Sequence, residues 1–134
     1  MFELTKQFRF EAAHTLQRRI ETDSSRRIHG HSYRAEIALR GYPDPATGML
    51  VDLGLFEQAL EDARDALDHR FLDEVPDLGP ATLENLSRWI WQRLVPVAPS
   101  GLYRVTVYRD SAGESCSYFG PVQLAGRAAS GAAA

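Results

Sequence analysis

Residues 29–39 read His-Gly-His-Ser-Tyr-Arg-Ala-Glu-Ile-Ala-Leu. From His31 onward the odd positions carry His, Tyr, Ala, Ile and Leu, whereas the charged Arg34 and Glu36 stand between them. A period of two is typical of a half-buried β-strand. This strand would begin with two histidines on one face, because side chains at positions i and i+2 of a strand point the same way.

The same alternation precedes this strand, and helical spacing follows it. Apolar residues on even positions near the N-terminus predict a first strand, and apolar residues every three to four positions predict two helices with Asp52 and Thr82 as N-caps. Further alternation near the C-terminus predicts a strand and, after a Ser-Ala-Gly-Glu turn, another. In chain order these elements are strands over 2–14 and from 29, helices over about 53–67 and 83–94, and strands over 103–107 and 116–124. The order β-β-α-α-β-β indicates an α+β fold.

The length and composition predict one domain. The chain of 134 residues is 44% hydrophobic and 25% charged, which suits a single packed domain over residues 1–125. Residues 126–134 are mostly alanine and glycine with nothing large to bury, so we expect a flexible tail without function. No apolar run is long enough to cross a bilayer, and residues 1–10 lack the basic start and apolar stretch of a secretion signal.

The net charge limits the binding partners we expect, and the cysteine content indicates the cellular compartment. With 15 basic and 18 acidic side chains the net charge is −3, so we expect neither nucleic acid nor a membrane surface as a partner. Cys116 is the one cysteine and cannot form an internal disulfide. A lone cysteine favours a reducing compartment, and we expect the protein to be cytoplasmic. Cys116 itself is interpreted as a half-buried strand residue without a catalytic role.

Three histidines lie where strands end or begin. His29 and His31 share a face of the second strand, and His14 ends the first. Three imidazoles with an open fourth position are typical of a catalytic zinc centre, in which the metal polarises a bound oxygen. The sequence therefore predicts a zinc (Zn²⁺) site at His14, His29 and His31. The alternative is that a His-x-His tripeptide on a strand is only exposed and polar.

The pair Asp68-His69 follows the first helix. A carboxylate next to an imidazole can orient its tautomer and support its protonated form, as general acid–base catalysis requires. The alternative is structural, because a histidine at a helix end also complements the helix dipole.

Several motifs together resemble one family. In order and spacing, five segments resemble the family of 6-pyruvoyltetrahydropterin synthase and 6-carboxytetrahydropterin synthase, namely residues 10–14, 29–33, 48–53, 67–72 and 82–86. The resemblance spans about residues 2–120. It implies a T-fold, in which a four-stranded antiparallel sheet carries two helices on one face. It also implies trimers that pair into hexamers, with each site at a subunit boundary and a pterin-like small molecule as the ligand.

The resemblance implies roles for individual residues, and at one catalytic position this sequence differs from the family. His14, His29 and His31 match the zinc ligands, and Asp68 and His69 match two members of the catalytic triad. The third member is a cysteine four residues before the first histidine of His-Gly-His, and Ser25 stands there. A serine hydroxyl is a poor base at neutral pH, whereas a thiol near pKa 8.5 can supply a thiolate.

A second departure concerns ligand recognition. The family places a glutamate at the end of the third strand, where it accepts hydrogen bonds from the pterin ring, and the matching residue is Arg109, which has donors only. A shift of one residue would let Asp110 act instead, and Thr82 matches a further pterin contact. Four arginines near the metal motif are either a phosphate-binding set or a solvated loop, namely Arg18, Arg19, Arg26 and Arg27.

Three functional hypotheses follow. The favoured one is a pterin-binding homologue whose standard lyase activity is very low. The second is an active zinc-dependent lyase on 7,8-dihydroneopterin triphosphate or a related pterin, with His69 as base and Ser25 as a relay. The third is a structural or regulatory assembly without a small-molecule role. In each case we expect a homo-oligomer, a trimer or hexamer, and we expect the helix-free face of the sheet to carry apolar side chains that assembly covers.

Overall fold

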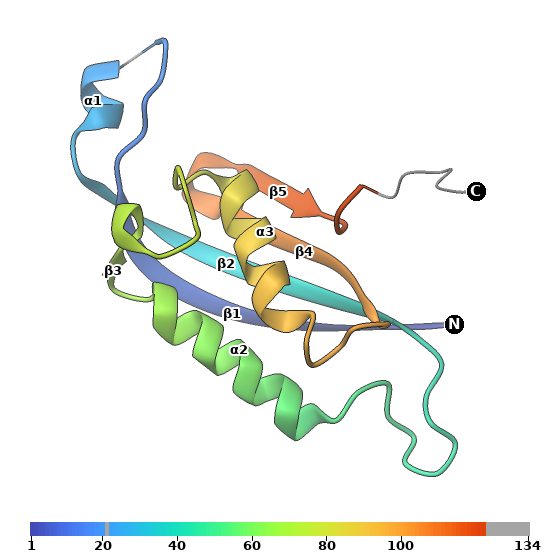
Figure 1. Ribbon diagram of the computed structural model, residues 1–134. Helices are drawn as coiled ribbons and strands as arrows, with labels where there is room; N and C mark the ends of the chain where they lie inside the picture. The colour runs from blue at the N-terminus through green and yellow to red at the C-terminus, as the bar shows by residue number, and fades with distance from the viewer. Residues whose placement is uncertain (21, 123–134) are drawn as a thin grey trace.

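The computed structural model describes residues 1–20 and 22–122, and its centre is a pair of long antiparallel strands (Figure 1). β1 (Phe2–His14) and β2 (His29–Gly41) are 13 residues each and pair from Phe2 opposite Gly41 to His14 opposite His29. The first predicted strand is confirmed residue for residue, and the second begins at His29. This unbroken register brings the end of β1 against the beginning of β2.

The sheet has five strands in the order β3-β1-β2-β4-β5, one more than predicted. β4 (Leu102–Arg109) pairs with β2, and β5 (Glu114–Tyr118) pairs with β4, both antiparallel. The extra strand, β3 (Arg70–Phe71), pairs parallel with β1. Two residues are too short for a detectable alternation, so the sequence gives no signal for β3.

The last strand is shorter than predicted. β5 ends at Tyr118, and Val122 lies outside it with 87% of its surface exposed. Pro121, which cannot donate a backbone hydrogen bond to a sheet, intervenes. Leu124 and the predicted tail over 126–134 lie outside the described residues, so the domain boundary at residue 125 stays a prediction.

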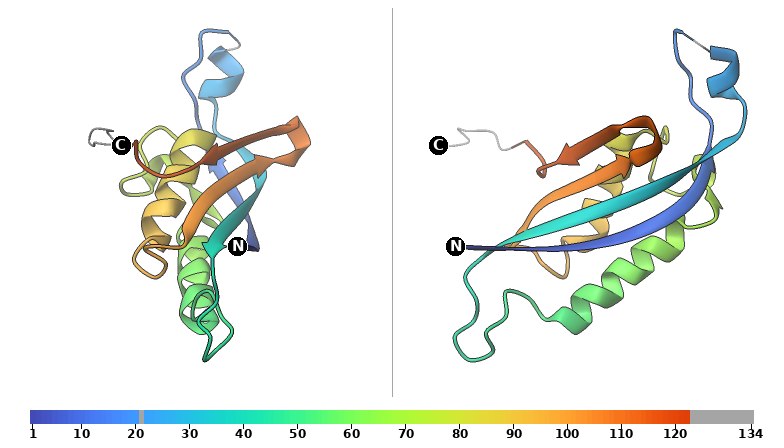
Figure 2. Two further views of the ribbon diagram at one scale, coloured as in Figure 1. Left: turned by 90° about the vertical axis from the view of Figure 1, so that its right-hand side faces the viewer. Right: turned by 180° about the vertical axis from the view of Figure 1, so that it is seen from behind.

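Both predicted helices are confirmed with their caps. α2 (Leu53–Leu67) is capped by the Asp52 carboxylate, and α3 (Leu83–Leu94) is capped by the Thr82 hydroxyl. The two helices cover the same face of the sheet (Figure 2), and their apolar sides complete the core with side chains of the strands. Three shorter elements were not predicted: α1 (Thr22–Arg26) and the 3-10 turns η1 (Leu72–Glu74) and η2 (Asp110–Ala112).

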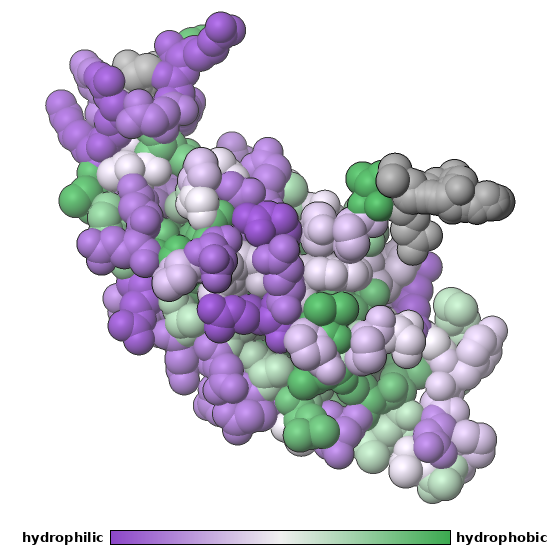
Figure 3. Space-filling model, in the orientation of Figure 1, coloured by the Kyte–Doolittle hydropathy of each residue, from purple (hydrophilic) through white to green (hydrophobic). Residues whose placement is uncertain are grey.

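The expectation of an apolar helix-free face is wrong. That face carries linked charges, because Arg104 pairs with both Glu3 and Glu36, and Glu3 also accepts a hydrogen bond from Arg40. Exposed apolar side chains gather instead where the chain enters α2 and at the start of β1 (Figure 3), and they include Phe2, Met49, Leu53 and Leu55. Among the described residues, no helix is long and apolar enough to cross a membrane.

Candidate metal centre and surrounding site

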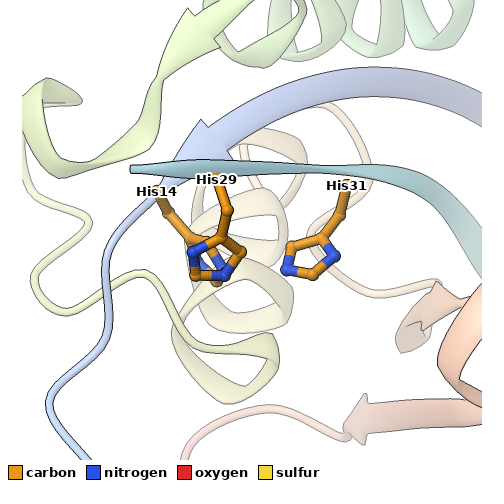
Figure 4. Close-up of side chains that lie close together, drawn as sticks. All are labelled: His14, His29 and His31. Atoms are coloured by element: carbon orange, nitrogen blue, oxygen red, sulfur yellow. The ribbon is translucent and has the colours of Figure 1, made fainter. Parts of the chain in front are cut away.

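The strand register places the three predicted histidines together. His14 lies directly opposite His29, and His31 is two positions further along β2, so all three side chains leave the same face of the sheet (Figure 4). Their ligand nitrogens all lie within 4.8 Å of one another. Three residues separated by up to 17 positions thus converge because two strands pair without a bulge.

Backbone carbonyls fix the orientation of two of the rings. His14 Nδ1 is 2.8 Å from the carbonyl oxygen of Ala81, and His29 Nδ1 is 2.8 Å from that of Arg27. Because a carbonyl only accepts, each Nδ1 must carry the proton, and each Nε2 of a neutral ring is left with a lone pair. The two Nε2 atoms face each other at 3.0 Å. Two lone pairs at that distance repel unless a cation lies between them.

This donor set fits a zinc ion. Zinc–nitrogen bonds of about 2.0–2.1 Å at tetrahedral angles hold two nitrogens about 3.4 Å apart, so small ring rotations are sufficient. A carbonyl that accepts from the second nitrogen of a ligating histidine is the usual outer support of such a site. Three imidazoles leave a fourth position open for a water or a ligand oxygen.

The electrostatic setting of His14 and His31 favours their neutral form. Burial lowers the pKa of His14. Burial, and next the Arg109 guanidinium, lower the pKa of His31 to about 4. Neutral imidazole is the form that binds a metal, so these rings are ready to coordinate at neutral pH.

Arg109 lies against this cluster. Its Nη1 is 3.4 Å from Nε2 of His31, and its side chain is only 16% exposed. The other side of the guanidinium donates to Glu114. Arg109 thus lies beside the histidines, its role in ligand binding stays a prediction, and its ion pair with Glu114 across the hairpin was not predicted.

The structure does not bring Asp110 to the histidines. Asp110 accepts two hydrogen bonds of 3.1 Å from Arg34, whose side chain lies over the ring of Tyr108. Arg34 and Tyr108 occupy even positions of their strands, which face away from the side that carries His31. The one-residue shift considered for this hairpin thus turns Asp110 to the opposite face.

Thr82 lies one residue beyond the carbonyl that orients His14. Its hydroxyl accepts from the backbone N–H of Asn85 at 3.1 Å, which is the N-cap bond of α3. The start of α3 and the metal cluster are therefore tied through Ala81.

Asp68 and His69 contact each other at the outer edge of β1. The Asp68 carboxylate is 3.3 Å from His69 Nδ1, and it accepts from the Glu11 backbone N–H at 2.9 Å. That hydrogen bond, and then the nearby Arg64, hold the pKa of Asp68 below its usual value. His69 has a left-handed backbone (φ 58°), and its side chain is 77% exposed.

The pair is separated from the metal cluster within one chain. His69 borders a shallow depression that is also lined by His31. Its other strand residues include Glu11, Ala13 and Ser32. These strand positions alternate with those of the three histidines and point to the other face of the sheet.

Ser25 lies on α1, which projects beyond the paired ends of β1 and β2 (Figure 1). It is buried, and its carbonyl accepts from the backbone N–H of Leu16 at 2.8 Å. Of the four arginines near the metal motif, Arg26 pairs with Asp23. Arg27 contributes its carbonyl to His29.

Tyr33 was also missed as a site residue. Its ring packs 5.7 Å from that of His31, and it is only 2% exposed. Burial raises its pKa to about 12. Within residues 1–20 and 22–122, its hydroxyl is the buried side-chain group without a satisfactory hydrogen bond. A tyrosine two positions after His31 on the same strand face was the available signal.

Comparison with known proteins places this site in a family. Residues 3–121 match the family model described as 6-pyruvoyl tetrahydropterin synthase. The chain belongs to this family. Human 6-pyruvoyl tetrahydrobiopterin synthase is 33% identical over 121 residues, which are 79% of this chain and 83% of the human one. The 6-carboxy-5,6,7,8-tetrahydropterin synthase of Synechocystis sp. is 30% identical over 126 residues, covering 90% and 95%.

Solved structures agree with this membership. The 6-pyruvoyl tetrahydropterin synthase of Caenorhabditis elegans superposes with a TM-score of 0.75 at 28% identity, over 90% of this chain and 96% of that one. The Plasmodium vivax enzyme gives a TM-score of 0.69 at 17% identity, which supports the fold alone. The predicted α+β T-fold is confirmed. Membership of the family supports a tetrahydropterin synthase-like function for this chain.

Proposed function

We propose that this family member binds zinc through His14, His29 and His31, binds a pterin-like ligand beside it, and has very low standard lyase activity. The supporting observation is a mismatch within one site. The metal ligands converge with their rings already oriented, whereas the position of the catalytic base holds a buried serine and the position of the pterin-binding glutamate holds Arg109.

The chain's own residues account for binding and orientation. His14 and His29 are held by backbone carbonyls, so only small ring rotations are needed to bind a metal. A zinc ion, when bound, would polarise hydroxyl oxygens of the ligand's side chain and acidify the neighbouring C–H bonds. Tyr33 packs against His31, and Arg109 beside it would offer hydrogen-bond donors to a ligand bound next to the histidines.

The missing element is a base. A serine hydroxyl is about five or more pKa units less acidic than a thiol, so Ser25 cannot hold an appreciable charge at neutral pH. The loss of a positioned base costs about 10² to 10⁴ in rate. We infer that the standard elimination of triphosphate is reduced accordingly.

Assembly is part of the proposal. His69 lies beside Glu11 and Ser32, whose side chains leave the face opposite the metal cluster. We infer that His69 and the neighbouring Asp68 would serve the histidines of a neighbouring subunit and not their own. A homo-oligomer, a trimer or hexamer, would supply this arrangement.

The test combines metal content, ligand binding and turnover. The purified protein should bind about one zinc per chain, and the His29→Ala/His31→Ala variant should bind none. The zinc-loaded protein should bind neopterin but release triphosphate from 7,8-dihydroneopterin triphosphate at well below about 1 s⁻¹. A protein that binds neither zinc nor neopterin would support the structural or regulatory hypothesis instead.

One observation favours the second candidate, an active lyase. Asp68 and His69 form a close pair at 3.3 Å, which is the contact that an imidazole base requires. Turnover of about 1 s⁻¹ or faster that is lost in His69→Ala would establish this candidate.

A further inference from the structure

The β4–β5 hairpin carries a carboxylate beside the position where the family's glutamate is missing. Arg109 and Glu114 are direct cross-strand partners, joined through η2 and Gly113, whose φ of 67° closes the turn. Side chains of such partners leave the same face of the sheet. Glu114 is therefore presented toward the same space as Arg109.

The ion pair leaves part of this carboxylate available. Arg109 Nε donates to Glu114 Oε1 at 2.9 Å, and Arg109 Nη2 donates to the same oxygen. Within the described residues both bonds end on Oε1, so Oε2 keeps its lone pairs for another donor. The side chain of Glu114 is 49% exposed and can be reached by a ligand.

The pair lies next to the metal cluster. Arg109 Nη1 is 3.4 Å from His31, and Glu114 is near enough to His31 for each charge to affect the other side chain's ionisation. The buried Tyr33 hydroxyl, which lacks a satisfactory partner, lies close to Arg109 as well.

The geometry points to Glu114, held by Arg109, as the carboxylate that binds the pyrimidine edge of the ligand. This edge of a pterin has an oxo acceptor followed by a ring N–H and an amino group, both donors. The guanidinium of Arg109 matches the oxo group, and the carboxylate of Glu114 matches the two donors. The recognition residue has thus moved from β4 to the facing position of β5. The inference rests on the proposed function.

The first test is calorimetric binding of neopterin to zinc-loaded protein. Glu114→Gln keeps the shape of the side chain but removes its charge, so neopterin affinity should fall tenfold or more. Zinc affinity and melting temperature should change little, because Glu114 is half exposed at the start of β5 and the Gln side chain can still accept a hydrogen bond from Arg109. Glu61→Gln, on the exposed side of α2, is the matched control and should bind neopterin normally. Neopterin affinity within twofold of normal in Glu114→Gln would overturn the inference.

A second test needs no variant. The 2-oxo counterpart of neopterin, a 2,4-dioxopteridine with the same side chain, lacks the amino donor that Glu114 would accept. The unmodified protein should bind it at least tenfold more weakly than neopterin. Equal or tighter binding of the dioxo compound would mean that Arg109 donates to its oxo groups and that Glu114 accepts no hydrogen bond from the ligand. The inference would then be wrong.

The two levels of failure are distinguishable. Zinc and neopterin binding that survive Glu114→Gln overturn the role of Glu114 but leave the proposed function intact. Absence of zinc and neopterin binding in the unmodified protein overturns both.

Discussion

Ser25 and Arg109 are two side chains that we expect to change the catalytic activity without changing the fold. The histidines and the strands that carry them are retained, and the carbonyls of Ala81 and Arg27 hold two of the rings. At position 25 a group that cannot ionise near neutral pH is buried. At position 109 a cation lies 3.4 Å from His31, a proposed metal ligand. The chain therefore has three histidines placed to bind a metal. It differs from the family at Ser25 and Arg109, the positions that we assign to proton transfer and ligand recognition.

Restoring the base should restore rate. Ser25→Cys supplies a thiol near pKa 8.5 at nearly the same volume, so triphosphate release from 7,8-dihydroneopterin triphosphate should rise tenfold or more. Ser24→Cys, one residue away and exposed, is the control and should leave the rate unchanged. An unchanged rate in Ser25→Cys would show that base strength does not limit this protein.

Asp68 should make stability depend on pH in the acid range. Its pKa is lowered in the folded chain, first by the hydrogen bond from Glu11, so its contribution is complete above the unfolded value near 3.8. It is lost as pH falls through the lower folded value. Between about pH 5 and 2, the free energy of unfolding should fall less steeply in Asp68→Asn than in the unmodified protein. Urea unfolding at several pH values measures this, with Asp62→Asn as the control; equal slopes would refute it.

At the scale of elements, the start of α3 and the metal centre are joined. Thr82 caps the helix, and the carbonyl of the preceding Ala81 orients His14. α3 also packs on β4 and β5, which carry Arg109 and Glu114. The position of one helix terminus therefore affects both the metal ligands and the proposed ligand-binding pair.

Removal of the cap should affect stability and metal binding together. Thr82→Ala should lower the free energy of unfolding by about 1 kcal/mol, because an N–H at the helix start loses its partner. Zinc affinity should fall several-fold, because the first turn and Ala81 become less fixed. Thr82→Ser, which keeps the hydroxyl, should preserve both. A destabilised variant with unchanged zinc affinity would show that His14 is oriented independently of the cap.

At the scale of the whole molecule, we propose that one chain does not complete the site. His69 lies beside strand residues of the helix-free face, opposite to the three histidines, and this same face carries paired charges. Apolar side chains are exposed instead near Phe2 and the start of α2. Assembly of several chains would bury the charged pairs on the helix-free face of the sheet. It would also bury the apolar side chains near Phe2 and the start of α2.

Sedimentation should detect this assembly. We expect a mass of about three or six times the 15.0 kDa of one chain at micromolar concentration. A stable monomer under these conditions would contradict a site shared between subunits.

Much of this structure was predictable because its signals are local. The long alternation of β1 and β2 and the capped helices α2 and α3 follow from periodicity, and their bounds are nearly those predicted. The convergence of His14, His29 and His31 follows from strand faces once pairing is assumed. Apolar side chains were wrongly expected on the helix-free face, because the pattern does not reveal cross-strand charge pairs.

The features that could not be predicted from the sequence depend on tertiary contacts. The two-residue β3 exists only because the chain after α2 meets β1, and Glu114 becomes a site residue only through its register with Arg109. The turn residue Gly113 was visible in the sequence, but the face to which Asp110 turns was not. Such placements depend on a single residue of loop length, because each step along a strand reverses the face.

The most direct test of the central claim is anomalous X-ray diffraction at the zinc edge from crystals of zinc-loaded protein soaked with neopterin. The account predicts one anomalous peak per chain, bonded to His14, His29 and His31 at about 2.0–2.1 Å, with intact neopterin beside it and its amino edge at Glu114. A peak at other residues, no peak, or density for a cleaved side chain would contradict it.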